Sequence, residues 1–158
     1  MNLFEALIKE LAEATGLPLQ VSADDSCCLE SDDMLITLQY RQECDDVVFF
    51  APILTPDEDE QIPAGVLRKA LELSYNGIGT HGAFLGLFNG ALVLSVTFPM
   101  NGLDAHLLGA RILAFTETAQ GIALELESVL LEEQGFDVQQ RSKENSEMIT
   151  EQQMLFKA

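Results

Sequence analysis

Two runs of mostly apolar residues flank Asn89-Gly90, and this pattern predicts a β-hairpin. Asn-Gly suits the two-residue turn of a hairpin, because both central residues of that turn adopt a positive φ. The pairs that such a turn sets are Phe88 with Ala91, Leu87 with Leu92 and Leu85 with Leu94. One face of the hairpin is dense enough in large apolar side chains to belong to the core, namely Leu85, Leu87, Leu92, Leu94, Val96 and Phe98.

The opposite face of the hairpin is too apolar for a solvated surface and too mixed for a second core. It carries Phe84, Gly86, Phe88, Ala91, Val93, Ser95 and Thr97. Helices of the same chain, a loop or a second chain are the candidates to cover it.

A long apolar stripe after the hairpin predicts one helix of about thirty residues, ending at Gly135. Asn101 is expected to cap its first turn, with Asp104 three residues later at the positive end of the helix dipole. The stripe recurs at alternating spacings of four and three residues and consists of Leu108, Ile112, Phe115, Ala119, Ile122, Leu126 and Val129. It either packs on the sheet or forms a self-associating coiled coil.

The remaining elements follow from capping, periodicity and turn residues. Asn2 and Glu5 resemble a capping box that opens a first helix, which Gly16 ends, and Pro63 suits the start of a second helix, which ends at Asn76-Gly77. The segments that read as strands before the second helix are Leu19–Val21, Cys27–Leu29, Met34–Tyr40 and Val47–Leu54. We therefore predict an α+β fold in the order α-β-β-β-α-β-β-α, with helices packed on an antiparallel twisted sheet.

Length and composition indicate one domain, because 158 residues suffice for one core and not for two comfortable ones. We predict a single α+β domain over residues 1–136. The segment 137–158 is poor in residues that could join a core, so we predict a C-terminal tail that is mobile or partly helical.

The charge balance narrows the class of partner. With 26 acidic and 8 basic residues, the net charge of −18 argues against nucleic acid and anionic membranes. No apolar run has the length of a membrane span, and the N-terminus lacks the features of a signal peptide. The three cysteines, Cys27, Cys28 and Cys44, fit a reducing compartment better than a disulfide framework, so we expect a cytoplasmic protein.

Catalytic and metal-binding patterns are weak in this chain. His81 and His106 are the only histidines, and no Ser-His-Asp or Cys-His constellation accompanies them. Cys27-Cys28 could meet His81 in space, but adjacent cysteines lack the C-x-x-C spacing of zinc and redox sites. The glycines of the loop 77–82 match G-x-G-x-x-G without the strand-to-helix context of a phosphate site. We therefore expect no enzyme activity, no catalytic residue, no metal and no cofactor.

Loose apolar spacings between Leu67 and Leu131 resemble the class I chaperones of bacterial type III secretion, the Tir chaperone family. The residues that carry the resemblance are Leu71 to Gly77, Gly82 to Leu87, Leu92 to Leu94, Phe98-Pro99, Leu103-Asp104, Phe115 and Ala119. The resemblance in pattern covers most of residues 1–137. The chain departs from many relatives in having Gly121 where an aromatic residue is common, no Trp, and a longer tail.

The resemblance implies a homodimer in the bacterial cytoplasm that serves virulence by holding the N-terminal segment of one or more secreted effectors in extended form for export. The secretion ATPase or the sorting apparatus would be a further partner. The residues expected to contact a client are Phe4, Leu7, Leu35, Val48 and Phe50. The residues expected to build the dimer contact are Val66, Leu67, Ala70, Leu71, Phe84 and Phe88. The alternative is a non-secretory protein-interaction module of the same fold that binds a cytosolic regulator.

Overall fold

The secondary structure has the predicted order along residues 2–155, which are the residues that the computed structural model describes. The side chains of residues 136–138, 152, 153 and 155 lie outside this description. The helices are α1 (Leu3–Thr15), α2 (Ala64–Ser74) and α3 (Ala105–Leu155), with a short 3₁₀ helix, η1 (Tyr75–Gly77), after α2. The strands are β1 (Ser26–Ser31), β2 (Met34–Arg41), β3 (Asp46–Leu54), β4 (Phe84–Phe88) and β5 (Ala91–Pro99). The α-β-β-β-α-β-β-α order is therefore confirmed.

The strands form one antiparallel sheet in the order β1-β2-β3-β5-β4, which leaves β1 and β4 as its edges. The β4–β5 hairpin has the predicted register, from the Phe88–Ala91 pair to the Leu85–Leu94 pair. Asn89 and Gly90 adopt φ of 49° and 80°. The turn chemistry read from Asn-Gly therefore sets the register of this half of the sheet.

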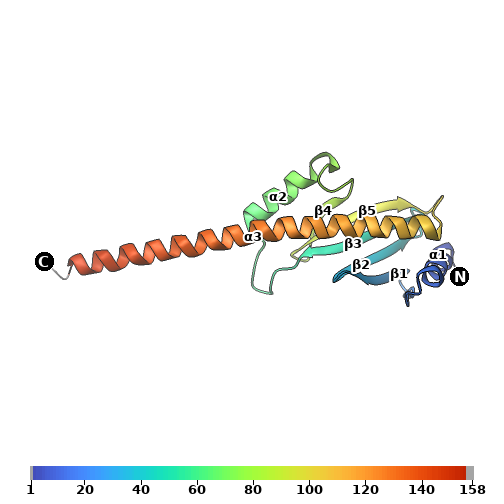
Figure 1. The fold of residues 1–158 in the computed structure, drawn as a ribbon, viewed down its shortest axis with the longest axis horizontal. Helices are drawn as coiled ribbons and strands as arrows, with labels where there is room; N and C mark the ends of the chain where they lie inside the picture. Colours follow the sequence, from blue (N-terminus) through green and yellow to red (C-terminus); the bar gives the residue numbers. More distant parts are fainter. Residues whose placement is uncertain (1, 156–158) are drawn as a thin grey trace.

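One face of the sheet forms the core together with α1 and α3, which lie along it (Figure 1). The fully buried strand residues on this face are Cys27, Ile36, Leu38, Val47, Phe49, Ala51 and Leu94. Helix α3 contributes its predicted stripe, which is buried from Leu108 to Leu126. The ring of Phe49 lies between those of Phe98 and Phe115, with centroids 5.1 and 5.8 Å away. Of the two alternatives for the stripe, packing on the chain's own sheet is the observed one.

Helix α1 has the predicted capping box. The side chain of Asn2 accepts a hydrogen bond from the Glu5 N–H at 2.8 Å, and the Glu5 carboxylate accepts one from the Asn2 N–H at 2.9 Å. Gly16 ends the helix in the left-handed region, at φ 72°. Phe4 is fully buried and stacks on Tyr40 of β2 at 5.7 Å between ring centroids. The cap thus fixes a helix whose apolar side is part of the core.

Both predicted ends of the last helix are wrong. Asp104, rather than Asn101, caps α3, since its Oδ1 accepts a hydrogen bond from the Leu107 N–H at 2.7 Å. The helix does not end at Gly135 but continues to Leu155, and its C-terminal half extends beyond the rest of the chain (Figure 1). A single glycine destabilises a helix by only about 1 kcal/mol relative to alanine. The Gln, Glu and Lys residues that follow it favour the helix, so the helix continues. Residues 156–158 of the predicted tail lie outside the described residues.

Two further expectations are wrong. Leu19–Val21 forms no strand, and residues 16–22 run as irregular backbone beside α1. Leu87 was expected in the core but is 59% exposed, because it lies on edge strand β4 next to the hairpin turn.

The second face of the sheet, which we call the open face, is not covered by any helix of the described chain. Phe84 and Phe88 on β4 are 70% and 69% exposed. Across β2, β3, β5 and β4, one row of paired residues on this face runs Thr37, Phe50, Ser95 and Phe84. The mixed face of the hairpin is therefore part of a wider uncovered surface.

Candidate functional site

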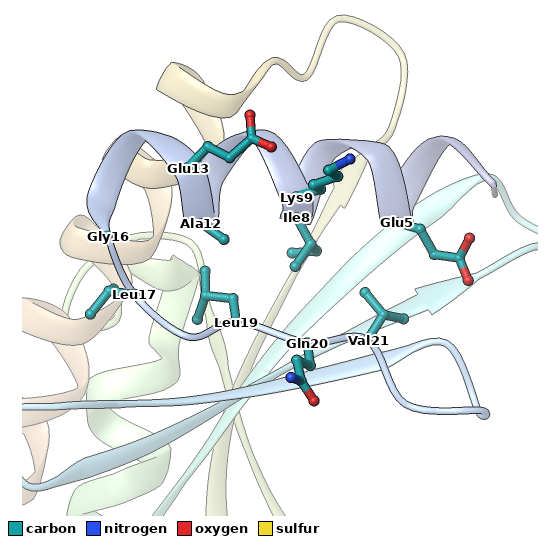
Figure 2. A pocket seen from close by; sticks show the side chains of 10 residues that line it. All are labelled: Glu5, Ile8, Lys9, Ala12, Glu13, Gly16, Leu17, Leu19, Gln20 and Val21. Atoms are coloured by element: carbon teal, nitrogen blue, oxygen red, sulfur yellow. The ribbon is translucent and has the colours of Figure 1, made fainter.

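A groove runs along α1, between this helix and residues 17–21 (Figure 2). In Figure 2, Ile8 and Ala12 point from the helix toward Leu19 and Val21 on the opposite wall. The volume of the groove is about 750 Å³, and charged side chains of α1, including Lys9, stand at its rim. The groove thus combines an apolar floor with a polar border, as protein-binding grooves do.

A second hollow of about 390 Å³ adjoins the groove, since Leu17 and Leu19 line both. Its other walls come from Leu29 of β1 and from Leu11 and Ile112 of the two covering helices. β1 is also an edge strand of the sheet. Apolar hollows and a sheet edge therefore meet at the same end of the molecule.

The five predicted client-contact residues fall into two groups. Phe4 and Leu7 are buried in the core on the inner side of α1. Leu35, Val48 and Phe50 lie on the open face, where Leu35 is 50% exposed and the other two are half-buried. The structure therefore does not bring the five together on one surface, and their role in binding stays a prediction.

The six predicted dimer residues also divide by exposure. Val66 and Ala70 are buried within their own chain, and Leu67 is half-buried. The other three, Leu71, Phe84 and Phe88, are exposed; Leu71 is 73% exposed. Their role in a dimer stays a prediction as well.

An ion pair links α2 to α3. Lys69 Nζ lies 2.8 Å from Glu125 Oε1, and this hydrogen bond raises the pKa of Lys69 above its usual value. The buried Val66 and Ala70 hold α2 against the core, and Leu71 projects from it into solvent.

The groove along α1 was not predicted from the sequence. Of its apolar lining, Leu19 and Val21 were assigned to a strand and Ile8 to the apolar face of the first helix, and none of them was named as a contact residue. The sequence did carry one indication of the groove, the segment Leu17-Pro18-Leu19 directly after the helix-ending Gly16. Apolar residues in a loop that follows a helix are expected to pack against the side of that helix.

Three features of the described residues bear on other classes of function. Cys27 and Cys28 on β1 lie at the opposite edge of the sheet from the loop that carries His81, so these side chains do not meet. Within residues 2–155, no three His, Cys, Asp or Glu side chains gather as a metal site would need. None of the described helices has the length and apolar character to cross a membrane.

The family model of the Tir chaperone protein (CesT) family matches residues 6–123 of this sequence. The match runs from α1 through the sheet into α3 and covers well over half of the chain. The protein therefore belongs to the Tir chaperone protein family. No curated protein sequence matches the chain at a significant level.

Solved structures share the fold. A chain of the HopA1–SchA chaperone–effector complex is 21% identical, with a TM-score of 0.63 over 77% of this chain and 94% of that one. A chain of the ExsC–ExsE complex is 19% identical, with a TM-score of 0.67 over 80% and 97%. A chain of the ExoU–SpcU complex from the type III secretion system of Pseudomonas aeruginosa is 18% identical, with a TM-score of 0.56 over 78% and 96%. At these identities the likeness establishes the predicted α+β chaperone fold.

Proposed function

We propose that this protein is a type III secretion chaperone that binds the N-terminal segment of one or more effector proteins in extended form. It keeps the bound client soluble and competent for export, and delivers it to the export apparatus. The observation that carries this proposal is the groove along α1 next to edge strand β1, in a chain that belongs to a chaperone family.

The geometry suits an extended peptide better than a folded partner. An edge strand offers main-chain hydrogen bonds to an added strand, and a shallow apolar groove accepts side chains of a strand or a short amphipathic helix. The net charge of −18 favours a client segment with basic residues around its apolar ones and keeps an apolar surface soluble.

Capture from the native host tests the proposal. The full chain should retain a stoichiometric partner that is a secreted protein, protected from limited proteolysis over an N-terminal segment. A cytosolic regulator as the partner would favour the non-secretory interaction module instead, and a protein that captures no partner would contradict both.

Substitutions of exposed leucines make the test specific to the surface. Leu17→Gln in the groove and Leu35→Gln on the open face should each lower client affinity by about tenfold, the effect of losing a buried leucine contact. Leu124→Gln on α3, at a comparably exposed leucine outside both surfaces, is the matched control and should leave affinity unchanged. Equal binding by all three variants would contradict the assignment of these surfaces.

We also propose that two copies associate through α2 and β4. Three large apolar side chains on these two elements are exposed and support this contact, namely Leu71, Phe84 and Phe88. Single exposed apolar residues are common on protein surfaces, whereas several on neighbouring elements indicate an interaction surface. Leu71→Asp should convert a dimer into monomers in sedimentation equilibrium, because it places an unpaired charge in the contact. The control variant Leu124→Asp should remain a dimer. The assignment would be contradicted if Leu71→Asp also remained a dimer, or if the wild-type protein were a monomer.

A further inference from the structure

Arg111 of α3 forms no ion pair with an acidic residue of the described chain. Its Cζ lies 4.1 Å from the centroid of the Phe98 ring, and its Nε is buried with no acceptor among the described residues. Two other cations of the chain do form ion pairs, Arg41 with Asp46 and Lys69 with Glu125. An arginine that stacks on an aromatic ring and has no carboxylate partner keeps its charge available for a ligand.

A cavity of about 180 Å³ opens beside this arginine. It lies between α3, β5 and the loop before β4. Its polar lining includes His81, Arg111 and Thr118, and its apolar lining includes Val96, Phe98 and Phe115. The cavity therefore has both polar and apolar lining side chains.

Hydrogen bonds hold His81 at the wall of this cavity. The Thr118 hydroxyl donates to the Ala114 carbonyl at 2.9 Å, and its oxygen lies 3.0 Å from His81 Nδ1, within hydrogen-bond distance. The imidazole is thus tied to the α3 side of the cavity. The His81 backbone has a φ of +51°, and the Thr80 hydroxyl donates to the Ala83 carbonyl across the same loop. This loop conformation holds the imidazole against α3.

We propose that this cavity binds a carboxylate on a short alkyl stem. The guanidinium of Arg111 supplies the charge, His81 borders the same cavity, and the apolar lining residues accommodate methylene groups. A volume of about 180 Å³ suits a group of this size and is too small for a nucleotide or a folded segment. A glutamate side chain of a bound polypeptide and a free short-chain acid both present this chemistry.

Titration of the ¹⁵N-labelled full chain with sodium propionate tests the proposal by NMR. The Arg111 Nε–H resonance should shift saturably with propionate. Equal ionic strength of sodium chloride, or the neutral isostere propionamide, should give no saturable shift. If propionate shifts the Arg111 Nε–H resonance no more than sodium chloride does, the proposal is overturned.

Three variants locate the site. Arg111→Gln should lower propionate affinity more than about tenfold, through loss of the charge-assisted hydrogen bonds. His81→Asn, which tolerates the positive φ, should weaken binding severalfold. Arg68→Gln, at an exposed arginine of α2, is the matched control and should bind as the wild type does. Unfolding midpoints compared by circular dichroism confirm that each variant folds; undiminished binding by folded Arg111→Gln would overturn the proposal.

A pair of blocked tripeptides separates the two sources of the carboxylate. If acetyl-Ala-Glu-Ala-amide shifts the same resonances and its Gln counterpart does not, the ligand is a polypeptide side chain. If propionate binds and neither tripeptide does, the ligand is a free acid. Leu17→Gln acts on the proposed client groove and should leave propionate binding unchanged. Failure of this site and failure of the chaperone function are therefore distinguishable.

Discussion

The two faces of the sheet are built from the same strands, and both carry large apolar side chains, yet only one of them is covered. On β2, Leu38 is fully buried and Leu35, three residues earlier, is half exposed. On β1, Cys27 is buried and its neighbour Cys28 is exposed. The difference lies outside the strands, because α1 and α3 offer their apolar sides to one face only. Exposed apolar surface in this protein is thus a consequence of where the helices lie, and it is the surface that a partner can use.

The largest contrast between the faces is expected in thiol alkylation. Burial raises the pKa of the Cys27 thiol, and the charge of Cys28 adds to this effect against a weaker opposing hydrogen bond from the Gln20 backbone. The reactive thiolate of Cys27 is therefore disfavoured as well as inaccessible. Iodoacetamide at pH 8 should modify Cys28 at least about a hundredfold faster than Cys27, as measured by peptide mass spectrometry. In urea the two rates should converge; similar rates in the native protein would contradict the contrast.

Matched leucine substitutions on β2 should separate the faces by stability. Leu38→Ala should lower the free energy of unfolding by about 2–5 kcal/mol, because it leaves a cavity in the core. Leu35→Ala should cost less than about 1 kcal/mol, since half of its side chain is already in water. Urea unfolding at low protein concentration measures both. Equal losses would mean that another layer covers the open face in solution.

Removing the cap of α1 should loosen the covering layer without touching the sheet. Asn2→Ala deletes the acceptor of the Glu5 N–H and the hydrogen bond from Asn2 Nδ2 to Asp25, 2.7 Å long. We expect a loss of about 1 kcal/mol in the free energy of unfolding. Asn2→Ser, which restores the cap acceptor, should recover part of it; no loss in Asn2→Ala would show that packing alone holds α1.

The smallest effect is expected at the ion pair between α2 and α3. Glu125→Gln should cost at most about 1 kcal/mol of unfolding free energy, because both side chains are partly exposed to solvent. The cost should shrink in 1 M salt. Glu127→Gln, at an exposed glutamate of the same helix, is the control and should be neutral. A larger, salt-insensitive loss would mean that α2 depends on this pair for its place beside the sheet.

Local chemistry made several elements predictable from sequence. The Asn89-Gly90 turn fixed the hairpin register, and the Asn2–Glu5 capping box and Gly16 fixed the ends of α1. The α3 stripe predicted a buried helix side, because a run of apolar residues at this spacing needs a partner surface. The end of α3 was not predictable in this way, since a lone glycine at position 135 weakens a helix without having to end it.

The surfaces proposed for binding depended on tertiary structure. Leu85 and Leu87 lie on the same face of β4, and nothing local in the sequence separates the half-buried one from the one that is 59% exposed. The groove along α1 exists because residues 17–21 run beside the helix and do not join the sheet. The cavity at Arg111 forms where a loop, a strand and a helix meet. The sequence by itself determined the order of the helices and of the five strands and the hairpin register, since these follow from contacts between near neighbours. Tertiary structure alone decided which apolar side chains stay uncovered, because that depends on how distant elements pack.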